Sequence, residues 1–262
     1  MAKARVKLKE SDYSEEVDIL SNGDILMDGD KYDASQIKFD NPISGTVYGT
    51  LLNYKGSLEA LKEKIDHPPY NEPPKGPILY IKPRNTFSSF SNPVPLPNGI
   101  PELEIGAALG IVINKTATRV KKEHASDYIE GYTIVNDISI PHESVYRPAI
   151  RYKARDGFCP IGPWVVSKES ISNPDSLGIR VFINGELRQE NSTVNLIRSI
   201  SQLIEDVTDF MTLNPGDVLL VGVPENVPLA KADDYIRIEI DEIGYLENTI
   251  IPEVKLSKEG VL

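Results

Sequence analysis

The chain has 262 residues, 40% of them hydrophobic and 26% charged, a composition typical of a folded globular protein with a sizeable core. Its formal net charge of −11 argues against a nucleic-acid partner, because binding to phosphates requires a basic face. No apolar run could span a membrane and a single cysteine excludes an internal disulfide, so we expect a cytoplasmic protein with no membrane partner.

Residues 1–44 are expected to form a small, acidic N-terminal β domain. Short strands are predicted at 4–8, 16–20 and 24–27, separated by turn signals rich in Asn, Asp and Gly. An Asn-Pro-Ile-Ser-Gly sequence at 41–45 ends this pattern. We therefore expect a boundary there, with a larger catalytic-type domain over residues 45–262.

The next segment mixes strands and short helices. A proline-rich stretch at 68–77 cannot form regular structure and is predicted to be a mobile loop or lid. The expected strands are 46–52, 77–81 and 102–113, and the expected helices are 56–66 and 121–130.

The second half has the same character. Asn184-Gly185 is the strongest hairpin signal in the chain, joining strands at 177–182 and 186–189. Thr193 is expected to cap a long helix whose apolar residues from Leu196 to Met211 form one stripe, which predicts core packing rather than a cofactor site. Further strands are expected at 218–221, 235–240 and 244–251. Many strands and few helices, without βαβ alternation, predict a mixed α+β, mostly β fold.

One strand of the second half ends in a carboxylate. Residues 131–138 have the pattern of a buried strand, and near its end this strand presents Asn136-Asp137. A carboxylate is rarely buried unless it is paired, hydrogen-bonded or bound to a metal. Asp137 therefore either caps the following turn or belongs to a functional site.

A cationic segment follows this strand. If residues 149–155 are extended, Arg151, Lys153 and Arg155 share one face. Such a face could bind an anionic small molecule, and the alternative is an edge strand whose charges are solvated. His142 and Glu143 are acid/base candidates, and an exposed histidine at the start of a helix is the alternative for His142.

Cys159 lies in the same stretch of sequence. A cysteine nucleophile needs an activating partner, and the chain has only three histidines. A small buried thiol is the more common role of a free cysteine. We predict a buried thiol, with a nucleophile as the alternative.

Several segments, in the same order along the chain, resemble the fumarylacetoacetate hydrolase family. They are 45–54 (GTVYGTLLNY), 78–86 (ILYIKPRNT), 131–139 (GYTIVNDIS), 151–163 (RYKARDGFCPIGP), 182–189 (FINGELRQ) and 211–224 (MTLNPGDVLLVGVP). The resemblance implies a β-roll core, usually dimeric, that acts on acidic oxo- or hydroxy-diacids with Mg²⁺ or Mn²⁺. Within the family, the chain looks most like the N-terminal half of bifunctional isomerase/decarboxylases of homoprotocatechuate degradation.

The metal ligands of the family match this sequence only in part. The resemblance implies a Glu-x-Glu pair and the Asp of the Asn-Asp motif as ligands, and Asp137 matches that Asp. The Glu pair falls on Gly106 and Ala108, whose side chains cannot bind a hard cation. Glu102 and Glu104 lie four residues earlier, about 13 Å along a strand, and would reach the metal only if the strand register shifted. We therefore expect no cofactor.

Other family positions are changed or kept. Counting from Asn53-Tyr54, Ser57 stands at the position of the family's lid histidine. Pro141-His142 replaces an Arg-Asp pair, and Val223 replaces a threonine. The residues that match the family are Lys82, Asp137, Lys153 and Asp156. Binding residues are thus better preserved than the metal site.

The resemblance implies an isomerase, or a coupled decarboxylase, of a 2-hydroxyhepta-2,4-diene-1,7-dioate type dicarboxylate in 4-hydroxyphenylacetate degradation. The expected catalytic residues are Lys153, Asp137, His142 and Glu143, and the expected substrate-binding residues are Lys82, Arg151, Arg155 and Asp156. Isomerisation needs only a positioned acid and base, whereas decarboxylation usually needs an electrophile. The alternative is a non-catalytic subunit that pairs with a competent homologue, and the expected assembly is a homodimer or such a pair.

Overall fold

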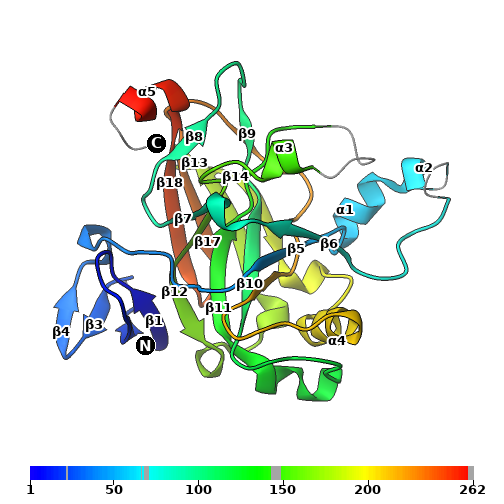
Figure 1. Cartoon of the computed structure of the whole chain (residues 1–262), viewed down its shortest axis with the longest axis horizontal. Coiled ribbons are helices and arrows are strands. Elements are labelled where there is room, and N and C mark those ends of the chain that lie inside the picture. The colour runs from blue at the N-terminus through cyan, green and yellow to red at the C-terminus, as the bar shows by residue number, and fades with distance from the viewer. Residues whose placement is uncertain (22, 66, 68–70, 143–148, 259–262) are drawn as a thin grey trace.

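The computed structural model describes residues 1–21, 23–65, 67, 71–142 and 149–258 (Figure 1). The strands are β1 (Ala2–Lys7), β2 (Ser14–Ile19), β3 (Ile25–Met27), β4 (Asp30–Tyr32), β5 (Val47–Leu51), β6 (Ile78–Lys82), β7 (Phe87–Ser89), β8 (Val94–Leu96), β9 (Leu103–Glu104), β10 (Ala107–Ile113), β11 (Ile129–Asn136), β12 (Cys159–Ser167), β13 (Gly178–Ile183), β14 (Glu186–Ser192), β15 (Val218–Leu220), β16 (Leu229–Ala230), β17 (Tyr235–Ile240) and β18 (Gly244–Pro252). The helices are α1 (Lys55–Ala60), α2 (Lys62–Ile65), α3 (Ile150–Lys153), α4 (Ile200–Phe210) and α5 (Glu253–Lys258). The prediction of a mixed, mostly β fold is confirmed.

The larger sheet closes on itself as a roll. Its strands follow the order β4-β3-β2-β1-β12-β11-β10-β15-β5-β6, and β7 pairs in parallel with β12, with Phe87 opposite Cys159. Only a short 3-10 turn (Arg84–Thr86) separates β6 from β7. The chain therefore returns from the far strand β6 to β12, and the strands between them enclose an interior.

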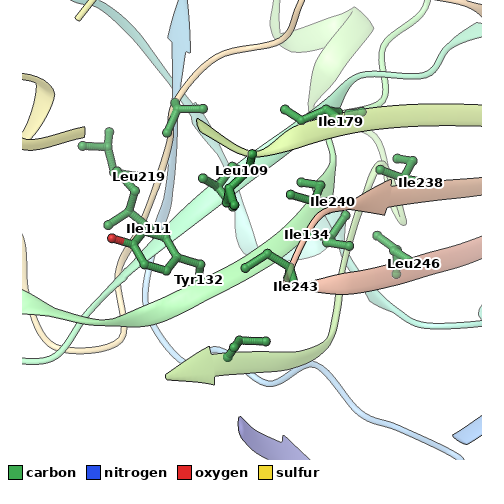
Figure 2. Close-up of a cluster of buried hydrophobic side chains, with 14 of the residues drawn as sticks. Leu109, Ile111, Tyr132, Ile134, Ile179, Leu219, Ile238, Ile240, Ile243 and Leu246 are labelled. Carbon is green, nitrogen blue, oxygen red and sulfur yellow. The ribbon is translucent and has the colours of Figure 1, made fainter. Parts of the chain in front are cut away.

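The outer face of the roll packs against a second sheet, with strand order β14-β13-β17-β18-β8. Figure 2 shows side chains from both sheets meeting in this apolar layer. The layer includes Leu109, Ile111, Tyr132, Ile134, Ile179, Leu219, Ile238, Ile240 and Leu246. Each of these side chains is buried, so the space between the two sheets is the main hydrophobic core.

A second, smaller core fills the inside of the roll. Its members alternate along the strands with the residues of the first core, as the two-residue period of a strand requires. They are Val47, Ala108, Val112, Val135, Cys159, Ile161, Val165, Val218 and Leu220. Cys159 is fully buried among them, which confirms the buried-thiol prediction.

The N-terminal strands extend the larger sheet at one edge. β1 pairs with β12, placing Ala4 opposite Val166, and β2, β3 and β4 follow as an antiparallel series (lower left in Figure 1). The three strands predicted in this region are confirmed within one or two residues. A separate domain over residues 1–44 stays a prediction.

The long helix begins later than its apolar stripe predicts. Ser199, not Thr193, is the N-cap of α4, and its hydroxyl accepts a hydrogen bond from the backbone N–H of Gln202. The Thr193 hydroxyl instead binds the backbone of Leu177 and Pro174. Thr193 therefore fixes the segment at 174–177 that precedes β13, and the predicted cap is wrong.

The predicted strand at 102–113 is interrupted. β9 pairs with β16, and β10 starts only at Ala107. The helix expected at 121–130 is a 3-10 segment (Lys122–Tyr128), and the helix expected at 56–66 divides into α1 and α2. Of the proline-rich stretch, residues 71–77 form no helix or strand, and 68–70 lie outside the described residues, so the lid stays a prediction.

Candidate active site

Asp137 lies directly after β11, at one end of the roll's interior. Its side chain is 1% exposed. One oxygen, Oδ1, is 2.9 Å from Nζ of Lys82, and the other, Oδ2, is 3.0 Å from Nζ of Lys153 and accepts a hydrogen bond from the hydroxyl of Tyr80. The carboxylate thus binds side chains from β6 and α3, which places Asp137 in an ion cluster.

Strand alternation explains why β6 supplies two members of this cluster. Tyr80 and Lys82 are two residues apart on β6, so their side chains leave the strand on the same face. Tyr80 is paired with Gly49 of β5, and a β-carbon at residue 49 would lie 2.0 Å from Cζ of the tyrosine. Glycine at this position therefore leaves the space that the tyrosine ring occupies.

Lys82 is an internal anchor. Its side chain is fully buried, and Nζ donates hydrogen bonds of 2.9 Å to the carbonyl oxygens of Ile138 and Lys153 in addition to its ion pair with Asp137. The contact with Asp137 is an ion pair, and Oδ1 accepts no hydrogen bond from the described residues. The predicted role of Lys82 in substrate binding stays untested, and its complete burial separates it from the partly exposed Lys153.

Lys153 differs from Lys82 in being partly exposed. Its side chain is 17% exposed, and its Nζ binds Oδ2 of Asp137 and lies 4.9 Å from the ring centroid of Tyr80. Among the interactions of the described residues, this leaves part of its donor capacity for a ligand. Lys153 is the group in the cluster that can contact a bound anion.

The predicted cationic face is wrong, because 149–155 is not extended. Residues Ile150–Lys153 form the helical turn α3, in which Arg151 and Lys153 diverge by about 200° around the axis. Arg151 is exposed, and Arg155 lies 3.8 Å from Glu253. Asp156 is also exposed and accepts a hydrogen bond of 2.7 Å from Asn85. Among the charged residues at 151–156, Lys153 is the one that forms an ion pair with Asp137.

Of the two acid/base candidates, His142 contacts Tyr152 of α3, and Glu143 lies outside the described residues. The His142 ring stacks on Tyr152 at 4.7 Å, and its Nδ1 is 2.9 Å from the carbonyl oxygen of Ile140. Neither contact involves Asp137. Glu143 lies outside the described residues, so the catalytic roles of both side chains stay predictions.

The strand register separates the glutamates from Asp137. The backbone N–H of Asp137 donates to the carbonyl of Gly106 at 2.8 Å, and Glu104 pairs with Ser139 in the same register. The carboxylate of Glu104 accepts a hydrogen bond from the Ser139 hydroxyl, and Glu102 lies two residues further away. A register shift that would bring these glutamates to Asp137 is therefore absent from the described strands.

The described residues around Asp137 do not fit a divalent cation. Mg²⁺ and Mn²⁺ prefer several oxygen ligands, whereas two ammonium groups already bind this carboxylate. Gly106 approaches so closely that a β-carbon there would lie 2.4 Å from the Asp137 carbonyl oxygen. Over the described part of the chain, no three His, Cys, Asp or Glu side chains form a metal-binding group.

The cluster is electrostatically unbalanced. Two ammonium groups and one carboxylate give it a formal charge of +1. Burial would raise the pKa of Asp137, but Lys153 and Lys82 hold that pKa well below its usual range. Burial lowers the pKa of Lys82 despite the nearby Asp137. Such a site stabilises an added negative charge, such as a carboxylate or an enolate.

Two neutral groups border these charges. Burial and the Asp137 carboxylate raise the pKa of Tyr80 well above its usual value, so the phenol remains a donor. Burial raises the pKa of Cys159 to about 12, which argues against the nucleophile interpretation. Tyr80 was not predicted as a site residue. It lies in the predicted strand 77–81, and its two-residue spacing from Lys82 would place both side chains on one face if that strand extended to Lys82, as β6 does.

Comparisons with known proteins agree with this architecture. Residues 46–251 match the family model described as fumarylacetoacetate (FAA) hydrolase C-terminal. A 4-hydroxyphenylacetate degradation bifunctional isomerase/decarboxylase of Escherichia coli is 41% identical over 211 residues, covering 80% of this chain and 48% of the relative. The chain thus spans about half the length of that relative.

Two further proteins are similar over more of their own length. An oxaloacetate tautomerase of Bacillus subtilis is 33% identical over 231 residues, covering 84% of this chain and 75% of the relative. The crystal structure of a 5-carboxymethyl-2-hydroxymuconate delta-isomerase from Mycobacterium smegmatis superposes with a TM-score of 0.77 at 28% identity, covering 96% of this chain and 99% of that one.

The helices of the described residues include none with the length and hydrophobicity of a membrane span. The chain belongs to the fumarylacetoacetate hydrolase family.

Proposed function

We propose that the chain is an isomerase of an unsaturated 2-hydroxy/2-oxo dicarboxylate of the 2-hydroxyhepta-2,4-diene-1,7-dioate type, in 4-hydroxyphenylacetate (homoprotocatechuate) degradation. The observation that carries the proposal is the partly exposed ammonium group of Lys153, fixed beside Asp137 in a cluster of formal charge +1. The names of the Escherichia coli and Mycobacterium smegmatis relatives support this substrate class. The alternative of a non-catalytic partner subunit has no support among them.

The chemistry requires stabilisation of an oxyanion. Ketonisation of a dienol removes a proton from the enol oxygen and adds a proton to a distant carbon, so no atoms are gained or lost. The intermediate is a dienolate whose negative charge lies largely on oxygen. The ammonium group of Lys153 provides a fixed positive charge for this oxygen in a partly desolvated place. Decarboxylation would leave an electron pair on carbon and calls for a stronger electrophile, so we propose isomerisation.

The residues take different roles in this proposal. Lys153 contacts the substrate oxygen. Asp137, whose pKa is held low by its two lysines, is a weak base and instead positions Lys153. His142 and Glu143 remain the candidates for moving the proton, and Arg151 the candidate for a distal carboxylate. Dimerisation or pairing with a homologous subunit stays a prediction.

A second candidate function is tautomerisation of oxaloacetate. It is favoured by the Bacillus subtilis relative, of which this chain covers 75%. The chemistry is the same, because oxaloacetate also passes between keto and enol forms through an enolate beside a carboxylate. The shorter substrate would use Lys153 in the same way.

The test compares Lys153→Met, Lys153→Arg and wild type, all treated with chelator, on both substrates by ultraviolet absorbance. Loss of the charge beside the enolate should lower kcat/KM of Lys153→Met by about 100-fold or more, and Lys153→Arg should retain part of the activity. Lys122→Met, which removes an exposed lysine, is the matched control. Wild-type turnover that survives Lys153→Met unchanged would contradict the role of Lys153, and no wild-type turnover on either substrate would contradict the proposed function.

A further inference from the structure

We propose that Tyr80 is a positioning residue that keeps Lys153 available to an anionic ligand by sharing the carboxylate oxygen to which Lys153 is bound. The inference deepens the proposed function and rests on it for the identity of the substrate. Its structural basis is the convergence of Tyr80, Lys153 and Lys82 on one buried carboxylate.

The hydroxyl of Tyr80 and the ammonium group of Lys153 compete for the same atom. Both donate to Oδ2 of Asp137, whereas Lys82 lies at Oδ1. A carboxylate oxygen has two lone-pair positions, so the phenol leaves one of them for Lys153. Lys153 is therefore held by one hydrogen bond to Oδ2.

The ring of Tyr80 supports Lys153 as well. Nζ of Lys153 lies 4.9 Å from the ring centroid, a distance at which a cation is attracted to an aromatic face. The ring is fixed in turn by Gly49, where a side chain would overlap it. Burial and the Asp137 carboxylate raise the pKa of the Tyr80 phenol, which favours the protonated form that donates to Oδ2.

Removal of the hydroxyl has a specific consequence. Without the phenol, Lys153 is the one remaining donor to Oδ2 among these groups, so the negative charge on this oxygen attracts the ammonium group more strongly. The ammonium group then moves onto Asp137 and away from a ligand. Affinity for dicarboxylates should fall, although the buried ion cluster itself remains intact.

The experiment is a double-mutant cycle with malonate as the dicarboxylate probe, measured by isothermal titration calorimetry. Tyr80→Phe keeps the ring and should raise the malonate Kd about tenfold, the size of change expected when one charge-assisted hydrogen bond is redistributed. In the Lys153→Met background the same substitution should change the Kd less than about twofold, because Tyr80 acts through Lys153. Tyr13→Phe, at a tyrosine that is 79% exposed, is the control and should leave the Kd unchanged.

Two outcomes overturn the proposal. One is a malonate Kd of Tyr80→Phe equal to that of wild type. The other is an equal effect of Tyr80→Phe with and without Lys153, which would indicate a merely structural role. A second variant, Tyr80→Leu, also removes the ring and should weaken malonate binding further than Tyr80→Phe. The cycle needs no turnover, so a failure of the proposed function is seen separately as wild-type inactivity on both substrates.

Discussion

The two interiors of this protein are built from alternate residues of the same strands, yet they differ in chemistry. Ile134 of β11 faces the apolar layer between the sheets, whereas Val135 and then Asp137 face the inside of the roll (the layer is shown in Figure 2). The layer between the sheets is apolar on both sides, and the interior of the roll ends in three charged groups. One face of the sheet thus stabilises the fold, and the other places the site.

The two regions should therefore respond differently to substitution. Apolar packing is spread over many contacts, so trimming one side chain removes a limited share of the stabilisation. The ion cluster is small and interdependent, because removal of Asp137 leaves the buried ammonium group of Lys82 and the partly exposed one of Lys153 without their counter-charge. The predictions below separate these two responses.

The largest effect is expected for Asp137→Asn. This change keeps the shape of the side chain but leaves Lys82 and Lys153 uncompensated, and it should lower the free energy of unfolding by about 3–5 kcal/mol. Urea denaturation measures the change. The matched control is Asp156→Asn at an exposed carboxylate, which should cost less than about 1 kcal/mol. Equal losses in both variants would contradict the account of the cluster.

A smaller effect is expected for Ile134→Val in the layer between the sheets. The side chain is 1% exposed, and loss of one methylene group should cost about 0.5–1.5 kcal/mol. Malonate affinity should stay within about twofold of wild type, because the side chain of Ile134 lies in the layer between the sheets and not in the interior of the roll. A large loss of malonate binding in this variant would show that the two interiors are not separable.

The pH dependence of stability distinguishes the regions in another way. The pKa of Asp137 is lower in the folded protein than in the unfolded chain, where it is about 3.9. The stabilisation that the ionised carboxylate gives the fold is therefore fully present above about pH 3.9 and is lost as the pH falls further. The stability difference between wild type and Asp137→Asn should therefore shrink below about pH 4. Ile134→Val should show a constant difference over the same range. Denaturation series from pH 7 to pH 2.5 test both expectations, and a difference that does not depend on pH would contradict the ionised state of Asp137.

The smallest effect is expected for Arg155→Ala. Its guanidinium group faces Glu253 of α5 at 3.8 Å and lies at the surface, where ion pairs contribute little. We expect a change in malonate Kd of less than about twofold, compared with a large loss in Lys153→Met. A comparable loss in both variants would restore Arg155 to the binding site and contradict the geometry of α3.

Local signals predicted much of the fold. The Asn184-Gly185 turn joins β13 to β14 with positive φ angles of 53° and 82°, as its composition requires. The apolar stripe of α4 was also recognisable. The α4 start and the conformation of 149–155 were not, because they depend on which distant backbone groups Thr193 and Tyr152 bind.

The site was predictable in its members more than in their roles. The placement of Asp137 after a buried strand and the match of Lys82 and Lys153 to the family identified three charged groups that the structure brings together. Two features follow only from the pairing of β5 with β6 and the approach of α3. One is that Lys82 is buried and bonded to two backbone carbonyls, and the other is that Tyr80 joins the cluster through the space left by Gly49. Such long-range placement has no local sequence signal.

Two lysines occupy the carboxylate at which the family resemblance implies a metal ion. Binding of Mn²⁺ by the chelator-treated chain, followed by electron paramagnetic resonance, tests this most directly. We predict that adding an equimolar amount of wild-type chain leaves the free Mn²⁺ signal the same as in the matching solution without the chain. This comparison is made once in buffer alone and once in buffer with malonate. One Mn²⁺ bound per chain, and lost on Asp137→Asn, would contradict the claim.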